Sequence, residues 1–322
     1  MIRLNGPALA VAALCFHFLI PNAAQAQSYS EVPYAPEVGS RWSVVSVTDG
    51  EEIKPGSQTV NQKITMTSEF TVEEKLPVGY RVTYAMRDFK IEGNAPAREM
   101  AQTAFSAMKG VVVRGRINAS GKPVAVDNFD EVKVSVNKVV DSLAKGFADK
   151  PQLAGFLRQM LTVFLDVDSA RAPEVYMEDM TPLAAGQTTG IVPGAVKRED
   201  NAVPTPFGAS VKSALETRIE SFDNAAGKVR YIRKQAFDKE SLKTVTLAMT
   251  EKLVAASGNK QITPEIMAQM KDVRFDLQSE AVITVEGGMT RKIDDRSVTE
   301  AQLMGHIMRK TEKKVMTVTR VN

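Results

Sequence analysis

The chain has 322 residues, of which 43% are hydrophobic and 25% charged, and its 41 Lys and Arg nearly balance its 38 Asp and Glu. A chain of this length can bury a sizeable core without covalent cross-links, and its balanced charge argues against a polyanionic partner such as nucleic acid. With one cysteine and two histidines, it has few residues for disulfides, thiolate metal sites or imidazole catalysis.

The first 26 residues have the parts of a secretory signal peptide. Arg3 gives a positive start, Ala8 to Ile20 is an apolar run, and Ala-Gln-Ala at 24–26 is a small-x-small cleavage site. The run is too short to anchor the chain stably in a bilayer, and no later run is long enough to span one. The sequence therefore predicts export to the periplasm, in a Gram-negative bacterium, with no membrane span in the mature chain.

Cleavage there would remove Cys15 and one of the two histidines, leaving His306 as the only imidazole of the mature chain. Along the first half, alternating apolar residues predict long antiparallel hairpins with one solvated face. Trp42, the only tryptophan, is expected to anchor the core. Strands are predicted at 39–47, 60–72, 80–91, 111–117 and 124–126, turns at 76–79 and 118–121, and a helix at 95–109.

The segment from Phe129 to Val167 has the strongest helical periodicity in the chain. Two apolar stripes with spacings of three and four predict a pair of helices, with Asp130 and Asp149 placed to cap them. Both helices must cover apolar surface, either as core or as the lining of a lipid pocket. The stripes are Val132, Val136, Val139, Val140, Leu143 and Phe147, then Leu153, Phe156, Leu157, Met160, Leu161, Phe164 and Leu165.

The stretch from 166 to 206 is irregular and polar, so a boundary is placed near residue 175, between halves at 27–175 and 176–322. The second half resembles the first in its order of hairpin, short helix and hairpin. The segment 241–253 is ambiguous, because Thr-Val-Thr-Leu favours a strand while its apolar spacing suits a helix; we assign a strand. The other predictions are strands at 209–222, 229–237, 273–285, 289–293 and 306–320, and a helix starting at Thr263.

These elements predict an α+β fold made mostly of long antiparallel β-hairpins. The hairpins would form one curved sheet or two related sheets, with the central helical pair packed against the concave side. A cationic cluster in the last strand is expected to protect an exposed sheet edge from aggregation, with contact to anionic lipid as the alternative. Its members are Arg309, Lys310, Lys313 and Lys314.

Few residues suit catalysis or metal binding. His306 has no Gly-x-Ser-x-Gly serine to activate, and Ser135 with Lys138 matches Ser-x-x-Lys without its partner motifs. An acidic patch from Asp166 to Asp179 lacks the spacing of a calcium loop, so a solvated surface is expected, with scattered-carboxylate calcium binding left open. The sequence therefore predicts no catalytic residue, no metal site and no cofactor.

The long amphipathic hairpins, the turn at 118–122 with Val124 and Val126 after it, and the helical pair resemble an uncharacterised family of exported bacterial β-rich proteins. More distantly, the arrangement is similar to the half-barrel carriers of lipids and lipoproteins in the bacterial envelope. The second resemblance implies binding of an apolar ligand and supplies no catalytic motif.

The leading hypothesis is a soluble, non-enzymatic periplasmic protein that binds a lipid or another apolar ligand. One alternative is a structural or interaction module that binds another envelope protein. A second is a hydrolase that uses two carboxylates, Asp294 or Asp295 with a remote partner. The expected apolar lining of the ligand site is Val140, Leu143, Phe147, Phe156, Met160 and Phe164.

Overall fold

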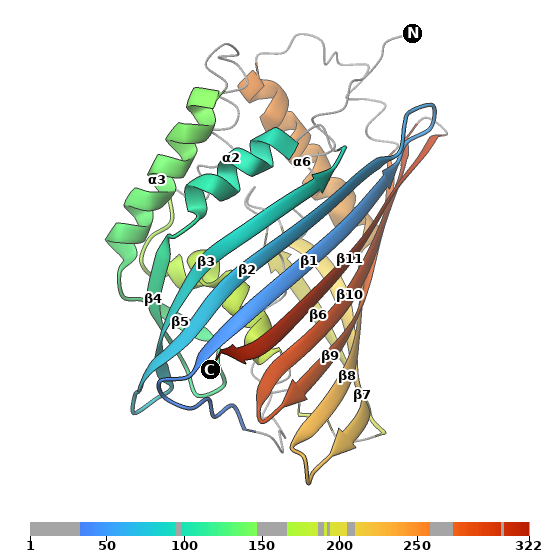
Figure 1. Ribbon diagram of the computed structural model, residues 1–322. Helices are drawn as coiled ribbons and strands as arrows, with labels where there is room; N and C mark the ends of the chain where they lie inside the picture. The colour runs from blue at the N-terminus through green and yellow to red at the C-terminus, as the bar shows by residue number, and fades with distance from the viewer. Residues whose placement is uncertain are drawn as a thin grey trace.

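The structure is a computed structural model that describes residues 33–94, 98–146, 166–185, 190–191, 194–204, 210–257, 273–303 and 306–321. Its main feature is one open antiparallel sheet of eleven strands, which twists strongly and curves around the helices (Figure 1). Both predicted halves contribute strands to it. Of the two arrangements that the sequence left open, the structure has the single sheet.

The strand order is β5-β4-β3-β2-β1-β11-β10-β9-β8-β7-β6. The first half of the chain forms a meander from the central strand β1 out to the edge strand β5, and the second half forms one from the edge strand β6 in to the central strand β11. β1 pairs with β11 along its full length. The first and last strands therefore join the two halves. The strands are β1 (Arg41–Ile53), β2 (Val60–Lys75), β3 (Tyr80–Gly93), β4 (Val112–Ile117), β5 (Pro123–Val126), β6 (Val196–Pro204), β7 (Ser210–Asp223), β8 (Lys228–Phe237), β9 (Arg274–Glu286), β10 (Met289–Leu303) and β11 (His306–Val321).

The described helices lie on the concave side of the sheet (Figure 1). The helix α2 packs against α3 and β3, α6 lies against β7 and β9, and the short segments α5 and η2 contact β5 and β10. We call the side chains on this concave side the inner face. The helices are α2 (Arg98–Met108), α3 (Phe129–Gly146), α5 (Ala172–Tyr176), the 3-10 helix η2 (Glu178–Ala184) and α6 (Lys239–Ser257).

The main core occupies one end of the inner face, which we call the core end. Every second residue of the strands is buried there, and η2 with its flanking residue Met177 closes the layer. Gly115 of β4 permits this closure, because a Cβ at Gly115 would lie 2.5 Å from the Met177 sulfur. Trp42 belongs to this core and is 6% exposed, which confirms its predicted role. Other members are Val44, Phe70, Val72, Val82, Tyr84, Ile117, Met180, Leu183, Tyr231, Ile283, Val285, Met316 and Val318.

The first predicted central helix is confirmed as α3. Val132, Val139, Val140 and Leu143 are buried, as the stripe requires. The helix begins one residue before Asp130, so the predicted cap at Asp130 is wrong: the preceding residue is Asn128, whose side chain accepts from the Arg114 N–H (2.8 Å) and ties the helix to β4. The second predicted helix, at 149–165, lies outside the described residues.

The segment 241–253 is helical, within α6, so the predicted strand is wrong. Asp238 starts the helix: its carboxylate accepts from the Ser241 N–H (2.8 Å) and its carbonyl from the Leu242 N–H (3.0 Å). The cap fixes the first turn, and the spacing of Leu242 and Val245 then buries both against β7 and β9. Local capping and packing outweigh the strand propensity of Thr-Val-Thr here.

The prediction of an edge strand at the C-terminus is also wrong. β11 lies between β1 and β10, and its cations are opposite acidic or polar residues, such as Lys313 opposite Asp49 and Lys310 opposite Glu52. The sheet edges are β5 and β6 instead. The sequence predicted no strand at β6, because its Lys-Arg-Glu-Asp run lacks apolar alternation; charged residues are common on such edges.

Candidate functional site

Away from the core end, the inner face becomes polar. A single row of directly paired residues crosses the sheet from Lys197 in β6 to Thr48 in β1, and we call this row the polar belt. Because directly opposite residues of antiparallel strands point to the same face, all of its side chains lie on the inner face. The polar belt consists of Lys197, Thr217, Arg233, Ala281, Asp295, Lys314 and Thr48.

The polar belt meets η2 at two places. The Arg233 guanidinium donates from Nη2 to the carbonyl oxygen of Ala185 (3.1 Å), at the end of η2. At the other end of η2, Lys314 lies close enough to Glu178 to favour its charged form. The belt therefore marks the boundary between the closed core and the remainder of the concave side.

Glu178 and Asp179 are half-buried at this boundary. Burial and, to a smaller extent, the adjacent Asp179 raise the pKa of Glu178 to about 8, against the opposing effect of Lys314. The Tyr84 hydroxyl contacts both Asp179 (3.1 Å) and Ser68 (2.9 Å), and burial with the nearby carboxylate raises the Tyr84 pKa. At neutral pH, Glu178 is therefore mostly protonated, which is unusual for a glutamate.

Beyond the core, β2 and β3 continue with apolar inner residues that are not fully covered. Ile64 lies opposite Ile91 and Met66 opposite Phe89, and all four are half-buried. Phe105 of α2 contacts Phe89 with ring centroids 5.6 Å apart. This set of four strand residues, the apolar strip, is partly accessible surface that faces the concave side.

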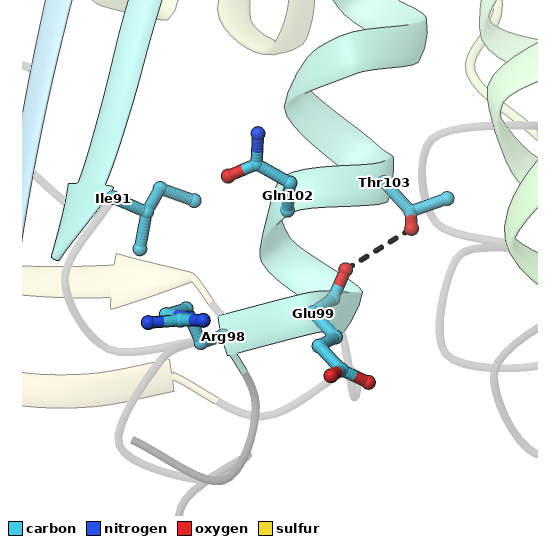
Figure 2. Close-up of a pocket in the computed structure, with 5 residues that line it drawn as sticks. All are labelled: Ile91, Arg98, Glu99, Gln102 and Thr103. Atoms are coloured by element: carbon cyan, nitrogen blue, oxygen red, sulfur yellow. Dashed lines mark hydrogen bonds between the residues drawn. The ribbon is translucent and has the colours of Figure 1, made fainter. Parts of the chain in front are cut away.

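A pocket of about 420 Å³ lies at the end of the apolar strip, between β3 and α2. Figure 2 shows Ile91 on one side and the first turns of α2 on the other. A volume of this size is within the range of small-molecule sites. Its rim is polar and its inner side is the apolar end of β3. The lining residues are Ile91, Arg98, Glu99, Gln102 and Thr103.

A second apolar cluster lies under α6, across the concave side from the strip. Val211 of β7 and Leu277 of β9 pack there against Leu242 and Val245 of α6, with Phe237 and Phe275 beside them. Three ion pairs join nearby residues of the inner face: Lys310–Glu312 (2.9 Å) in β11, Lys54–Glu52 (2.9 Å) at the end of β1, and Lys197–Glu199 (3.0 Å) in the edge strand β6. The concave side thus has two apolar regions, the apolar strip and the cluster under α6, together with the polar belt and these ion pairs.

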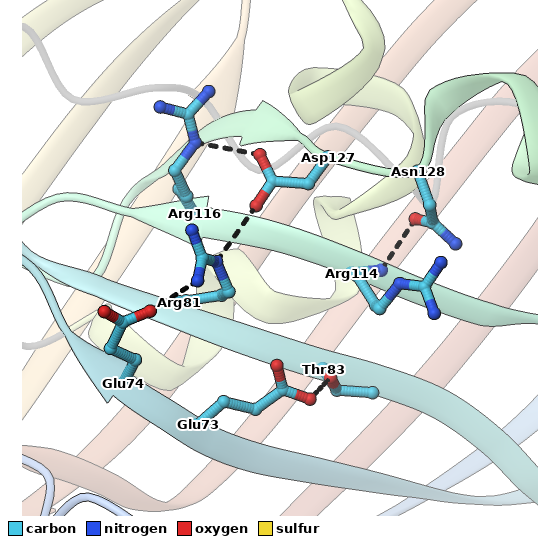
Figure 3. A network of polar contacts seen from close by, with 8 residues as sticks. All are labelled: Glu73, Glu74, Arg81, Thr83, Arg114, Arg116, Asp127 and Asn128. Atoms are coloured by element: carbon cyan, nitrogen blue, oxygen red, sulfur yellow. Dashed lines mark hydrogen bonds and ion pairs between the residues drawn. The ribbon is translucent and has the colours of Figure 1, made fainter.

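The outer face of the sheet is different, because its charged residues form exposed ion pairs, several of them across strands. Figure 3 shows Arg81 between Glu74 and Asp127, with Arg116 bonded to the same Asp127 (2.9 Å). Thr83 likewise donates to Glu73. We call Glu74, Arg81, Arg116 and Asp127 the outer network. It is typical of a solvated face, and it offers no concavity for a ligand.

Of the predicted lining residues, Val140 and Leu143 are buried in α3, whose packing partner is α2. Phe147, Phe156, Met160 and Phe164 lie outside the described residues, so the structure brings only the first two together. His306 is exposed at the start of β11. Ser135 donates to the Glu131 carbonyl (3.0 Å), within α3, as helical serines often do.

The two aspartates considered for hydrolysis point to opposite faces of β10. Asp294 pairs with Lys292 (2.9 Å) on the outer face, while Asp295 belongs to the polar belt. In the acidic patch, Asp168 accepts from the Arg171 N–H (2.9 Å) and Asp179 contacts Tyr84. Among the residues that the structure describes, no three His, Cys, Asp or Glu side chains converge as a metal site requires.

Sequence reasoning missed Arg233, and it placed Glu178 in the acidic patch, where a solvated surface was expected and the structure instead has a half-buried carboxyl group. Arg233 had a local signal: it alternates with Tyr231 and Val229 on the buried face of a predicted strand. Glu178 had none, because its burial depends on where η2 crosses the sheet. Within the described ranges, no helix is long and apolar enough to cross a membrane.

No protein family matches the sequence, and no curated protein matches it. Three solved structures share parts of its arrangement. Lipovitellin, from a study of lipid–protein interactions, has 8% identity and a TM-score of 0.39, covering 89% of this chain and 25% of its own. DynF of Micromonospora chersina has 8% identity, a TM-score of 0.20 and 93% coverage of both chains.

Ail, the attachment invasion locus protein of Yersinia pestis, has 6% identity and a TM-score of 0.14, covering 88% of this chain and all of its own. This chain spans about a quarter of the lipovitellin chain. All three TM-scores lie below 0.5, so these matches indicate no function for this chain.

Proposed function

We propose that this protein is a non-enzymatic binding protein of the bacterial periplasm, and that its concave side holds an apolar ligand such as a lipid. The observation that carries the proposal is the apolar strip. Its residues continue the inner face beyond the closed core and remain half-buried, beside a pocket open to solvent. Surface of this kind favours an apolar occupant, since each methylene removed from water contributes about 0.8 kcal/mol.

The polar belt is compatible with this proposal if the ligand is amphiphilic. An acyl chain would cover the apolar strip or the cluster under α6, and its head group would meet the polar belt. Exported proteins with cleaved signal peptides can meet lipids in the periplasm, so the predicted signal peptide supports the same proposal.

Lipid binding can be tested directly on the mature protein. Purification under mild conditions followed by native mass spectrometry should reveal bound lipid, and dodecanol should bind to the delipidated protein. Met66→Gln, on the apolar strip, should weaken dodecanol binding, while Thr67→Gln, the neighbouring position on the outer face, should not. The proposal is wrong if no lipid co-purifies and dodecanol does not bind; a single stoichiometric envelope protein in a pull-down would then favour the interaction module.

One observation favours a second candidate, hydrolysis that depends on carboxylates. Glu178 is mostly protonated at neutral pH and stands next to Asp179, which is the combination that a general acid and its partner require. Chromogenic glycosides and esters offer the test. Turnover that Glu178→Gln abolishes and Glu174→Gln retains would establish the enzyme; no turnover in the parent protein leaves the binding proposal as the better account.

A further inference from the structure

Arg233 differs from the other cations in the described part of the chain in how its donors are used. Its Nη2 donates to the Ala185 carbonyl, but its Nε is buried and has no hydrogen-bond partner among the described residues. Buried donors are nearly always paired in folded proteins, and arginine remains charged at any ordinary pH. A charged donor that the described residues leave unused therefore needs an explanation.

Arg233 has no counter-charge directly opposite it in the sheet. The residues directly opposite Arg233 in the sheet are Thr217 and Ala281, which are neutral. Glu199 is close enough to favour the charged guanidinium, yet its carboxylate is paired with Lys197 (3.0 Å). Burial lowers the pKa of Arg233, as expected for a cation held away from water.

We propose that Arg233 forms an anion-binding subsite that holds the carboxylate or phosphate group at one end of the apolar ligand. This inference rests on the proposed function and specifies its ligand class: an amphiphile with a single anionic head group. Arginine suits this role because its planar fork can donate two parallel hydrogen bonds to a carboxylate or phosphate.

The surroundings of Arg233 fit a head group with an attached chain. Toward the far end of β8, the inner face continues through Gln235, whose amide donates to Ser213 (2.9 Å), to Phe237. Phe237 belongs to the apolar cluster under α6. A bound amphiphile would therefore place its charge at Arg233 and its chain along the inner face toward α6.

The same strand offers a matched control. Arg230 lies on the outer face of β8 and is paired with Glu220 (2.8 Å), so its charge is satisfied and exposed. Arg233→Met and Arg230→Met remove the same charge from opposite faces of one strand. Arg233→Lys keeps the charge but removes Nε, and it provides a second variant if Arg233→Met does not fold.

The experiment measures the affinities of dodecanoate, dodecyl phosphate and dodecanol for the delipidated mature protein by calorimetry. We expect the parent and Arg230→Met to bind at least one of the two anions roughly tenfold or more tightly than dodecanol, the effect of one charged hydrogen bond. Arg233→Met should bind all three compounds with the affinity of dodecanol, and Arg233→Lys should show a reduced preference. Preference for dodecanoate would indicate a fatty acid, and preference for dodecyl phosphate a phospholipid.

Three results would overturn the inference. Dodecanol that binds the parent as tightly as both anions shows that no anion subsite exists, while lipid binding itself stands. An anion preference that survives in Arg233→Met shows that another cation holds the head group. Failure of all three compounds to bind the folded parent rejects the proposed function, and the subsite with it.

Discussion

The two faces of the sheet place charged residues in opposite environments. On the outer face, Arg41 and Arg87 donate to Glu69, and these hydrogen bonds hold its pKa below the usual value. On the inner face, burial raises the pKa of Glu178 to about 8 and leaves Arg233 with an unused donor. Charge on the outer face is solvated and lowers stability little, whereas charge on the inner face opposes folding. Stability therefore does not explain why the inner face keeps charged residues.

The largest effect on stability is expected in the core, where the inner face carries no charged residue. Phe70 is fully buried in the core, so Phe70→Ala should lower the free energy of unfolding by about 3–5 kcal/mol through lost burial and a cavity. Thr71→Ala, the next residue and on the outer face, should change it by less than about 1 kcal/mol. Urea denaturation of both variants measures the difference. Equal effects would show that the two faces are not distinguished as described.

The alternation of apolar residues in β1, β2 and β3 is what made this face difference predictable from sequence. Trp42 and Phe70 lie on the repeating apolar positions, and the hairpin turn at 118–121 forms with the Asn118 side chain bonded to the Ser120 and Lys122 N–H groups. Period-two patterns and turn residues are local signals, so they can be recognised without knowledge of the remaining fold.

Strand neighbours could not be predicted in the same way. β11 is an interior strand only because β1, from the opposite end of the chain, pairs with it, and no local feature of Lys313 or Lys314 indicates that partner. The charge environment of Arg233 and Glu178 depends on the same long-range contacts, namely on η2 crossing the inner face. The candidate site was therefore less predictable than the fold, because it lies where separate segments meet.

The second prediction concerns pH. Glu178 has a pKa of about 8 in the folded protein, above its ordinary value of 4.5, so the folded state binds the proton more tightly than the unfolded state. Stability from this group is present below pH 4.5 and is lost as the pH rises to about 8. Above that pH, Glu178→Gln should be more stable than the parent by about 2 kcal/mol, allowing for solvent screening.

Urea denaturation between pH 4 and pH 9 provides the measurement. The stability of the parent relative to Glu178→Gln should fall over that interval. Glu174→Gln, at an exposed position of α5, controls for the removal of a carboxylate. Asp179 and Lys314 are the titratable groups that act on Glu178, and Tyr84 contacts Asp179; all three remain in both variants. A parallel pH dependence of parent and Glu178→Gln would contradict the inner-face assignment.

The third prediction concerns the stability of the protein without ligand, on which Arg233→Met should have a smaller effect. The substitution removes a half-buried and incompletely paired charge and retains an apolar side chain of similar length, so the delipidated protein should be more stable by about 1 kcal/mol. A residue that lowers stability and improves ligand binding is expected at a binding site. Thermal unfolding of delipidated parent, Arg233→Met and Arg230→Met measures it; a loss above about 2 kcal/mol in Arg233→Met would assign the arginine a structural role in holding η2.

The smallest effect is expected in the outer network (Figure 3). Arg116 and Asp127 are bonded at 2.9 Å, but their side chains are 49% and 30% exposed, and Arg81 also contacts Asp127 (3.5 Å). A double-mutant cycle with Arg116→Gln and Asp127→Asn should give a coupling energy of about 0.5 kcal/mol, and 1 M NaCl should reduce it. The effect of Arg233→Met should change little with the same salt, because buried charges are screened less. A large, salt-insensitive coupling in the outer network would remove the contrast between the faces, since charge on the outer side would then also contribute like a buried pair.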